Sequence, residues 1–321
     1  MTEPIAGLFA AVPTPVDDEG RIDEAVFDRV VDFVVEAGVS GICIAGATGE
    51  YPHFETADRK AIIRRAAARL PRDRALLVGV GAPSMRHAIE LGEAAMKAGS
   101  RTVLLPMPMF FRYEQQDLEA YCAAVSRALR APCLLYNLPG FTNGLERSTI
   151  VNLLRTEANI AGIKDSSGDA ANLSALAGER GNEPWSLLVG DDRLLLSGLQ
   201  AGWDGAISGV AGFCPELPVA IHRSANSNQS NEAARLQGLL DELISRLMIF
   251  PAPWGIRIGL AARGYPTGPL PLPVTPDRQQ QIADFTAWLP GWLVSTGVID
   301  RAAGRPAPAG RTRPARQSTS D

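Results

Sequence analysis

The feature that most constrains the fold is an alternation of short apolar segments with longer amphipathic segments, which recurs eight times along the chain. Several of the amphipathic segments end in an Ala-Gly pair, as at Ala37-Gly38 and Ala98-Gly99, and glycine there is typical of the end of a helix. Short strands that alternate with helices favour βαβ units and a parallel sheet.

Eight segments have the composition of buried strands: Leu8–Val12, Gly41–Ala45, Ala75–Val80, Thr102–Leu105, Cys133–Tyr136, Ile160–Lys164, Leu187–Val189 and Gly205–Ile207. The segments between them have apolar residues at helical spacing: Asp23–Ala37, Thr56–Leu70, Ser84–Ala98, Gln115–Leu129, Glu146–Arg155, Asp169–Arg180 and Arg193–Ala201. Eight such units predict an α/β fold, a (β/α)₈ TIM barrel. A doubly wound open sheet is the alternative.

The pattern changes after the eighth strand. Three helices without intervening strands are expected at Asn231–Ile249, Trp254–Ala262 and Asp277–Leu293. We therefore expect a barrel over residues 1–226 and a C-terminal appendix of three helices over residues 227–298. Arg, Pro, Ala, Gly and Ser dominate residues 299–321, and a segment of this composition is predicted to be disordered.

Composition excludes several classes of function. The net charge is −4 and the body of the chain carries no basic cluster, which argues against a nucleic-acid partner. The sequence contains no run of 18 apolar residues, so no membrane span is predicted, and the first residues lack the features of a signal peptide. The four cysteines are scattered and the three histidines are widely spaced, so we expect reduced thiols, no metal site and no cofactor. A cytoplasmic protein is the expectation.

One lysine stands apart from the other charged residues. The chain has only three lysines, and Lys164 is the one that ends an apolar strand. Strict alternation along that strand predicts that Ile160, Gly162 and Lys164 share one face, with Ile163 on the other. Burial favours the neutral form of an amine, and a neutral amine attacks ketones to form a Schiff base. Taken alone, a lysine at a strand end whose ammonium reaches solvent is the competing interpretation.

The other strand ends indicate a partner chemistry for this lysine, because the function of such barrels lies at the carboxyl ends of the strands. Two glycines flank Thr48 after the second strand, so backbone N–H groups and a hydroxyl can bind a carboxylate there, although a plain turn is also possible. Tyr136 ends the strand before that of Lys164, and a phenol beside an amine can transfer protons. These residues together suit a 2-oxo acid held as an imine.

Four stretches carry a resemblance to a known family: Gly46-Ala47-Thr48-Gly49-Glu50, Tyr136-Asn137-Leu138-Pro139, Gly162-Ile163-Lys164-Asp165-Ser166-Ser167-Gly168-Asp169 and Gly190-Asp191-Asp192. Over residues 5–296 the sequence resembles the dihydrodipicolinate synthase / N-acetylneuraminate lyase family of pyruvate-type class I lyases. The resemblance implies a barrel with three C-terminal helices, often assembled as a homotetramer. It implies Lys164 as the Schiff-base residue, Tyr136 as the proton shuttle and Thr48 on the substrate carboxylate, with Gly190 and Ile207 along the pocket.

Three positions depart from the synthase branch of that family. Ala47 and Phe111 stand where that branch has relay hydroxyls, and Phe141 stands near its carboxylate-binding arginine. We therefore expect an aldolase that acts on a 2-oxo-3-deoxy sugar acid or a 4-hydroxy-2-oxo acid, with pyruvate and an aldehyde as its small-molecule partners. Dihydrodipicolinate synthase activity, a dehydratase acting through the same imine, and a non-catalytic barrel that binds a 2-oxo acid are the alternatives.

Overall fold

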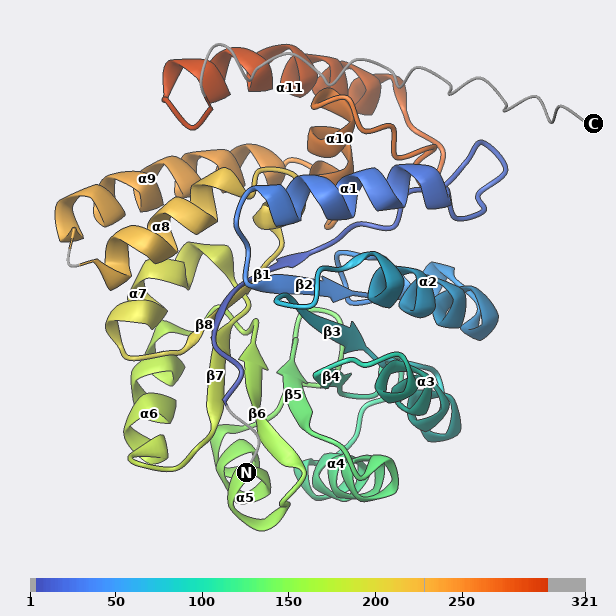
Figure 1. Cartoon of the computed structure of the whole chain (residues 1–321), viewed down its shortest axis with the longest axis vertical. Coiled ribbons are helices and arrows are strands. Elements are labelled where there is room, and N and C mark those ends of the chain that lie inside the picture. Colours follow the sequence, from blue (N-terminus) through green and yellow to red (C-terminus); the bar gives the residue numbers. More distant parts are fainter. Residues whose placement is uncertain (1–3, 228, 300–321) are drawn as a thin grey trace, which may run out of the picture.

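The computed structural model describes residues 4–227 and 229–299 and contains a closed barrel of eight parallel strands, each paired with its neighbours in sequence and β1 with β8 (Figure 1). The strands are β1 (Gly7–Ala11), β2 (Gly41–Ile44), β3 (Ala75–Gly79), β4 (Thr102–Pro106), β5 (Cys133–Asn137), β6 (Ile160–Asp165), β7 (Ser186–Val189) and β8 (Gly205–Ser208). The predicted TIM barrel is confirmed, and the open sheet is excluded because β8 closes onto β1 through four residue pairs.

A helix follows each strand and packs on the outside of the barrel. These helices are α1 (Glu24–Glu36), α2 (Thr56–Arg69), α3 (Met85–Lys97), α4 (Gln115–Leu129), α5 (Arg147–Thr156), α6 (Ala170–Arg180), α7 (Leu195–Gln200) and α8 (Glu216–Asn226). Sequence periodicity located the first seven and gave no bounds for α8. Three single 3₁₀ turns, η1 (Tyr51–His53), η2 (Asp192–Leu194) and η3 (Val210–Gly212), follow β2, β7 and β8 and were not expected.

The C-terminal appendix contains the three expected helices, α9 (Ser230–Leu247), α10 (Trp254–Ala262) and α11 (Pro276–Ser295). Figure 1 shows them beyond α1 and α8 at one end of the molecule, with α11 outermost. Helix α9 packs against α8, and α10 packs against α11. The tail expected to be disordered, residues 299–321, lies outside the described residues except for Ile299.

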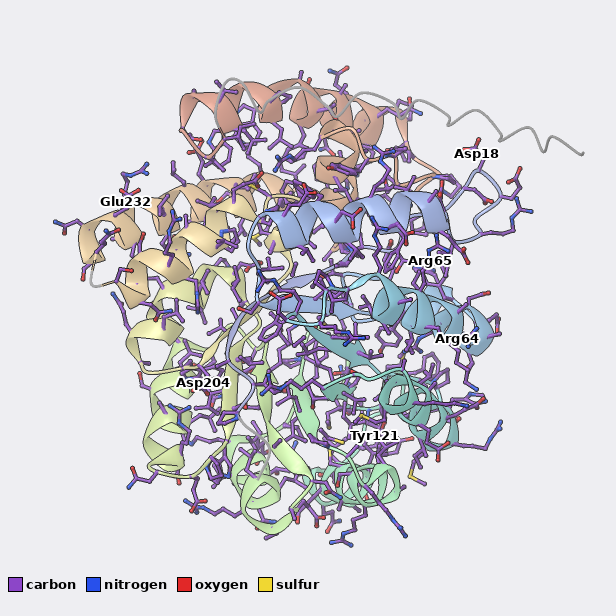
Figure 2. The ribbon with its side chains drawn as sticks, in the orientation of Figure 1. Asp18, Arg64, Arg65, Tyr121, Asp204 and Glu232 are labelled. Atoms are coloured by element: carbon purple, nitrogen blue, oxygen red, sulfur yellow. The ribbon has the colours of Figure 1, made fainter. Side chains whose placement is uncertain are left out.

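The strands have two apolar faces, because successive side chains on a strand point to opposite sides. One face fills the barrel interior with a cluster that includes Phe9, Leu77, Leu104 and Ile207. The other face packs against the surrounding helices in a larger cluster, and the side chains drawn in Figure 2 fill the space between strands and helices. An interior packed in this way leaves room for a ligand only beyond the ends of the strands.

Strand β6 corrects one prediction about its side-chain alternation. Cys133 of β5 pairs with Ile160, but Leu134 pairs with Gly162, so Ala161 is an extra residue on β6 and forms a bulge. The bulge reverses the alternation, and Ile160 therefore belongs to the helix-facing cluster with Ile163. The prediction that Ile160 shares a face with Gly162 and Lys164 was wrong for this reason.

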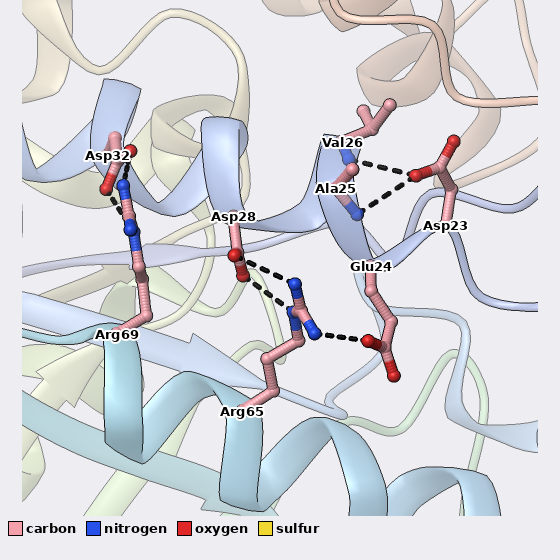
Figure 3. Close-up of polar contacts among 8 residues, drawn as sticks. All are labelled: Asp23, Glu24, Ala25, Val26, Asp28, Asp32, Arg65 and Arg69. Atoms are coloured by element: carbon pink, nitrogen blue, oxygen red, sulfur yellow. Dashed lines mark hydrogen bonds and ion pairs between the residues drawn. The ribbon is translucent and has the colours of Figure 1, made fainter. Parts of the chain in front are cut away.

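The joint between α1 and α2 shows how the helices are fixed to one another. Asp23 caps α1 by accepting hydrogen bonds from the backbone N–H groups of the first turn, and Arg65 of α2 binds Asp28 and Glu24 of α1 (Figure 3). The Arg65 Nε to Asp28 Oδ1 distance is 2.7 Å. Pairs of this exposure contribute little to stability individually, about 0–1 kcal/mol each, so they mainly set the alignment of the two helices.

Candidate functional site

A cavity of about 650 Å³ lies at the carboxyl ends of the strands, where the barrel meets the appendix. Its walls come from the segments that follow β2, β4, β5, β6, β7 and β8, and from the C-terminal end of α9 and the start of α10. A volume of this size suits a small organic ligand. The cavity contains the residues that the sequence marked for imine chemistry.

Lys164 and Tyr136 face each other inside this cavity. Their strands are in register, so Tyr136 pairs directly with Lys164, and Lys164 Nζ lies 4.1 Å from the centroid of the tyrosine ring. Both side chains are almost completely buried, at 5% and 3% exposed. Among the residues that the structure describes, no carboxylate forms an ion pair with Lys164, and the contact described for its amine is with the face of the Tyr136 ring.

Gly190 makes room for the lysine chain. A Cβ at this position would lie 2.0 Å from Ser166 Oγ and 2.8 Å from Lys164 Cε, closer than real side chains pack. Only glycine therefore fits beside the lysine without displacing it. Ser166 lines the cavity too, and its Oγ is buried without a hydrogen-bond partner in the described structure. An unsatisfied hydroxyl in a cavity is a site for a polar group of a ligand.

The Gly-Thr loop after β2 is a tight turn whose backbone donors face the cavity region. Glu50 N–H bonds to the Ala47 carbonyl at 3.0 Å, and the Thr14 hydroxyl donates to the Gly49 carbonyl at 3.0 Å. The described residues supply no hydrogen-bond acceptor for the N–H groups of Ala47 and Thr48. Since both residues line the cavity, these donors are available to an anionic group such as a carboxylate.

Acidic residues after β7 form another part of the cavity wall, and Asp192 and Thr48 both lie next to Gly209. Asp191 binds the Arg193 guanidinium through both oxygens, at 3.0 and 2.6 Å, so the cation at the rim is already paired. Asp192 accepts the Val210 N–H at 2.9 Å. Burial raises the pKa of Asp192, and this effect exceeds that of the hydrogen bonds from Ser208 and Val210, which lower the pKa. Asp192 thus has hydrogen-bond partners in the protein and is a second polar group that lines the same cavity.

A buried ion pair links the loop after β2 to the appendix. Arg257 of α10 binds Glu50 Oε2 at 3.0 Å, and both side chains are 4% exposed. The same guanidinium donates to the carbonyls of Thr267 and Pro269 at 2.6 and 2.8 Å. Glu50 Oε1 has no partner within the described residues. The appendix therefore fixes the turn that contains Thr48.

Asp165, the acid next to the lysine in sequence, has a different role. It points away from Lys164 and accepts hydrogen bonds from Asn137 Nδ2 at 3.0 Å, Asn172 Nδ2 at 2.8 Å, and the N–H and hydroxyl of Ser167 at 3.0 Å. Asn137 in turn accepts the backbone N–H of Leu145. This network fastens the segments after β5 and β6 to each other.

The structure brings together most of the residues that the sequence singled out. Six of the eight line the cavity: Lys164, Tyr136, Ala47, Thr48, Gly190 and Phe141. Two do not. Ile207 is fully buried in the barrel interior, below the cavity. Phe111 is 63% exposed on the segment after β4, packed edge-on against Phe110 with 4.9 Å between ring centroids.

Sequence reasoning also missed some residues that line the cavity. Tyr51 follows the motif that contains Thr48, and Ser166 lies within the motif that contains Lys164. Their position in the sequence alone would have predicted that they line the cavity. Asp192 was part of the recognised stretch Gly190-Asp191-Asp192 but was given no role of its own. The appendix residues Ile244, Met248, Ala252, Pro253 and Ile256 gave no signal, because their contact with the site depends on how α9 and α10 pack on the barrel.

Comparison with known proteins decides the family. A model of the dihydrodipicolinate synthetase family matches residues 4–290. The chain belongs to this family. It is therefore an enzyme of the pyruvate-dependent class I aldolase type, as the sequence predicted.

Relatives within the dihydrodipicolinate synthetase family have different activities. The chain is 32% identical to the 4-hydroxy-tetrahydrodipicolinate synthase of Sorangium cellulosum over 88% of this chain and 95% of the relative. It is 30% identical to a probable 2-dehydro-3-deoxy-D-pentonate aldolase of Escherichia coli over 74% of this chain and 80% of the relative. Among solved structures, a family member from Escherichia coli K12 in complex with pyruvate superposes with a TM-score of 0.84 at 26% identity. The match covers 92% of this chain and 99% of that one.

Three further observations concern helix length, metal-binding side chains and the cysteines. No helix within the described residues has the length and apolar character needed to cross a membrane. Across residues 4–227 and 229–299, no group of three or more His, Cys, Asp or Glu side chains is placed to hold a metal ion. The four cysteines are free and buried, and burial raises the pKa of the Cys43 thiol to about 11.

Proposed function

We propose that this family member cleaves or forms a hydroxylated 2-oxo acid, of the 2-oxo-3-deoxy sugar acid or 4-hydroxy-2-oxo acid type, through an imine between pyruvate and Lys164. The observation that carries the proposal is the buried amine of Lys164 against the face of Tyr136, 4.1 Å from the ring centroid, in the cavity that also contains Thr48. An amine without an acidic partner and out of bulk water is suited to attack a ketone.

Each lining residue has a part in this reaction. The N–H groups of Ala47 and Thr48 and the Thr48 hydroxyl bind the pyruvate carboxylate, which directs the keto carbon toward Lys164. Tyr136 gives a proton to the departing carbinolamine hydroxyl and later takes one from the substrate hydroxyl at C4. Gly190 leaves the space that the lysine chain needs. Phe141 borders the part of the cavity beyond pyruvate. For Ile207, which lies under the cavity, we propose support of the floor, and Phe111 has no proposed contact within one chain.

The hydroxyl groups of a sugar-derived aldehyde suit the remaining polar groups. The Ser166 hydroxyl has no partner in the described structure, and the Asp192 carboxylate, which accepts the Val210 N–H, also lines the cavity. An anionic aldehyde would need a free cation, and the Arg193 guanidinium at the rim donates to Asp191 through two of its three nitrogens. A buried anion without a partner loses hydration that is not replaced, which disfavours it.

4-Hydroxy-tetrahydrodipicolinate synthesis is the second candidate. Several relatives bear that name, and Arg193 could turn from Asp191 to a substrate carboxylate. The two candidate functions are distinguished by comparing two kcat/KM values. One is measured for the reaction of aspartate semialdehyde with pyruvate, and the other for pyruvate release from a panel of 2-oxo-3-deoxy acids. A preference for the semialdehyde would contradict the proposed substrate class.

The imine itself is tested by trapping with borohydride. Wild-type protein incubated with pyruvate and borohydride should gain one pyruvate-derived adduct, located on Lys164 by peptide mapping. Lys164→Ala should gain none, whereas the matched control Lys97→Ala, at an exposed position of α3, should label as the wild type does. Labelling that persists in Lys164→Ala would overturn the assignment. Absence of labelling in the wild type would favour the non-catalytic alternative.

We further propose that the chain assembles as a homotetramer and acts in the cytoplasm. Exposed aromatic side chains support assembly, since Phe110 is 91% exposed beside Phe111, and large apolar side chains on a surface mark contacts with another protein. Four free thiols are consistent with a reducing compartment. Light scattering of the purified protein measures the assembly, and a monomer at micromolar concentration would contradict it.

A further inference from the structure

Tyr51 lies in the same cavity as Lys164 and Tyr136, immediately after the loop that contains Thr48. The residue is 6% exposed. A phenol in the wall of a cavity can donate a hydrogen bond to a group inside that cavity.

The strand order places this hydroxyl beside Tyr136. A Cβ at Gly81, just after β3, would lie 2.8 Å from Tyr51 Oη and 2.7 Å from Cγ of Pro106. The Tyr51 hydroxyl is therefore over the ends of β3 and β4. Pro106 pairs with Tyr136 across β4 and β5, and Tyr136 pairs with Lys164 across β5 and β6. Tyr51 thus approaches Tyr136 from the side opposite to the lysine.

Arg59 holds the Tyr51 ring in this place. Its guanidinium carbon lies 5.0 Å from the ring centroid and its nitrogens donate to the carbonyls of Gly81 and Gly79 at 2.6 and 2.9 Å. Burial raises the pKa of Tyr51 to about 12, and Arg59 opposes this only in part. The Tyr51 hydroxyl consequently keeps its proton near neutral pH and acts as a donor.

This geometry leads to an inference that rests on the proposed imine function. We infer that Tyr51 is a positioning residue for proton transfer, whose hydroxyl donates a hydrogen bond to the oxygen of Tyr136 when that oxygen becomes negative. The resemblance to the synthase branch implies relay hydroxyls at two positions that are Ala47 and Phe111 in this chain. Tyr51 supplies a hydroxyl to Tyr136 from a third position.

The hydrogen bond acts at two steps. In the first, Tyr136 transfers its phenolic proton to the carbinolamine hydroxyl, the C2–O bond breaks, water leaves and a protonated C2=N imine forms. In the second, the Tyr136 oxygen takes the proton of the C4 hydroxyl as the C3–C4 bond breaks, and the electrons of that bond pass into the imine to give an enamine. Between these steps Tyr136 is a phenolate, and a donated hydrogen bond stabilises it.

The test uses Tyr51→Phe, which removes the hydroxyl and keeps the ring on Arg59. The rate of borohydride-trapped imine formation with pyruvate and the kcat for the substrate should both fall by about ten- to hundredfold, the effect of losing one hydrogen bond to a charged group. The pyruvate concentration that gives half-maximal trapping should be unchanged, because Thr48 and its loop are intact. Gly81→Ala, which displaces the ring, should slow the same two rates.

Tyr265→Phe is the matched control. Tyr265 packs against Phe33 of α1, with 5.0 Å between ring centroids, and does not line the cavity, so removing its hydroxyl should leave both rates unchanged. Rates within threefold of the wild type for a folded Tyr51→Phe, or a loss confined to pyruvate binding, would overturn the inference. Because wild-type trapping tests the imine separately, failure of this inference is distinct from failure of the proposed function.

Discussion

The ion pair between Glu50 and Arg257 gives the sharpest prediction about how the appendix supports the site. Arg257→Met keeps an unbranched apolar stem and removes the charged guanidinium. Glu50 would then be a buried carboxylate without any partner, because Oε2 loses the guanidinium and Oε1 already lacks one in the described structure. Removing one member of a buried ion pair costs about 3–5 kcal/mol of the free energy of unfolding.

That cost translates into a measurable change in melting temperature. With an unfolding entropy of about 2.1 cal/mol/K per residue, a chain of 321 residues loses about 1.5 °C per kcal/mol. We therefore expect Arg257→Met to melt about 4–7 °C below the wild type, as measured by differential scanning calorimetry. The pyruvate concentration that gives half-saturation should also rise, because the turn at Glu50 holds the backbone N–H donors of Ala47 and Thr48.

Two further variants separate the ion pair from a general effect of charge. The double variant Glu50→Gln with Arg257→Met should be less destabilised than Arg257→Met alone, because it leaves no buried charge. Arg235→Met removes an exposed pair with Glu232, which projects from α9 in Figure 2, and should change the free energy of unfolding by less than about 1 kcal/mol. Arg257→Met melting no more than about 1.5 °C below the wild type would refute the reasoning.

Three other variants test the site. Gly190→Ala places a methyl group 2.8 Å from Lys164 Cε, so imine trapping with pyruvate should fall at least tenfold, whereas Gly178→Ala, whose new methyl meets nothing within 4 Å, should label normally. Tyr136→Phe should keep the melting temperature and lower kcat by about 10²–10⁴-fold, the range for a lost acid–base group, and near-normal turnover would exclude the role. Burial raises the pKa of Asp192 above its unfolded value. The contribution of Asp192 to the free energy of unfolding is therefore fully present below the unfolded pKa and is lost as the pH rises through the folded pKa. The melting temperature of Asp192→Asn should therefore increase relative to that of the wild type as the pH rises above about 4, and a difference that does not change with pH would contradict this.

The barrel could be predicted from sequence because its signals are local. Each strand is a short apolar run and each helix has its own period, so the alternation survives without knowledge of any partner. The bulge at Ala161 could not be predicted in this way, since it depends on how β6 pairs with β5. It left Gly162 and Lys164 pointing inward as expected and altered only the residue at the start of the strand, Ile160.

The site was predictable where function demands a particular residue at a strand end. Lys164 and Tyr136 could be placed together because neighbouring strands in a parallel barrel bring their ends side by side. Phe111 shows the limit of this argument. Its loop extends beyond the strand, and Asn143 Nδ2 holds that loop by donating to the carbonyls of Pro108 and Phe111 at 2.6 and 2.8 Å, with the aromatic ring directed outward.

The two sides of the cavity differ in chemistry, and this difference explains how one reaction can serve several substrates. The barrel supplies the polar groups, among them Lys164, Tyr136 and Thr48, whereas the appendix supplies apolar side chains such as Met248 and Ile256. Pyruvate needs the polar groups for its carboxylate and keto carbon. In the proposed reaction the aldehyde portion lies between Ser166 and Asp192 on the barrel side and the apolar side chains of the appendix, which take no part in imine formation. Selection for a new aldehyde can therefore act on α9 and α10 without disturbing Lys164, provided that the Arg257 contact to the β2 loop is kept.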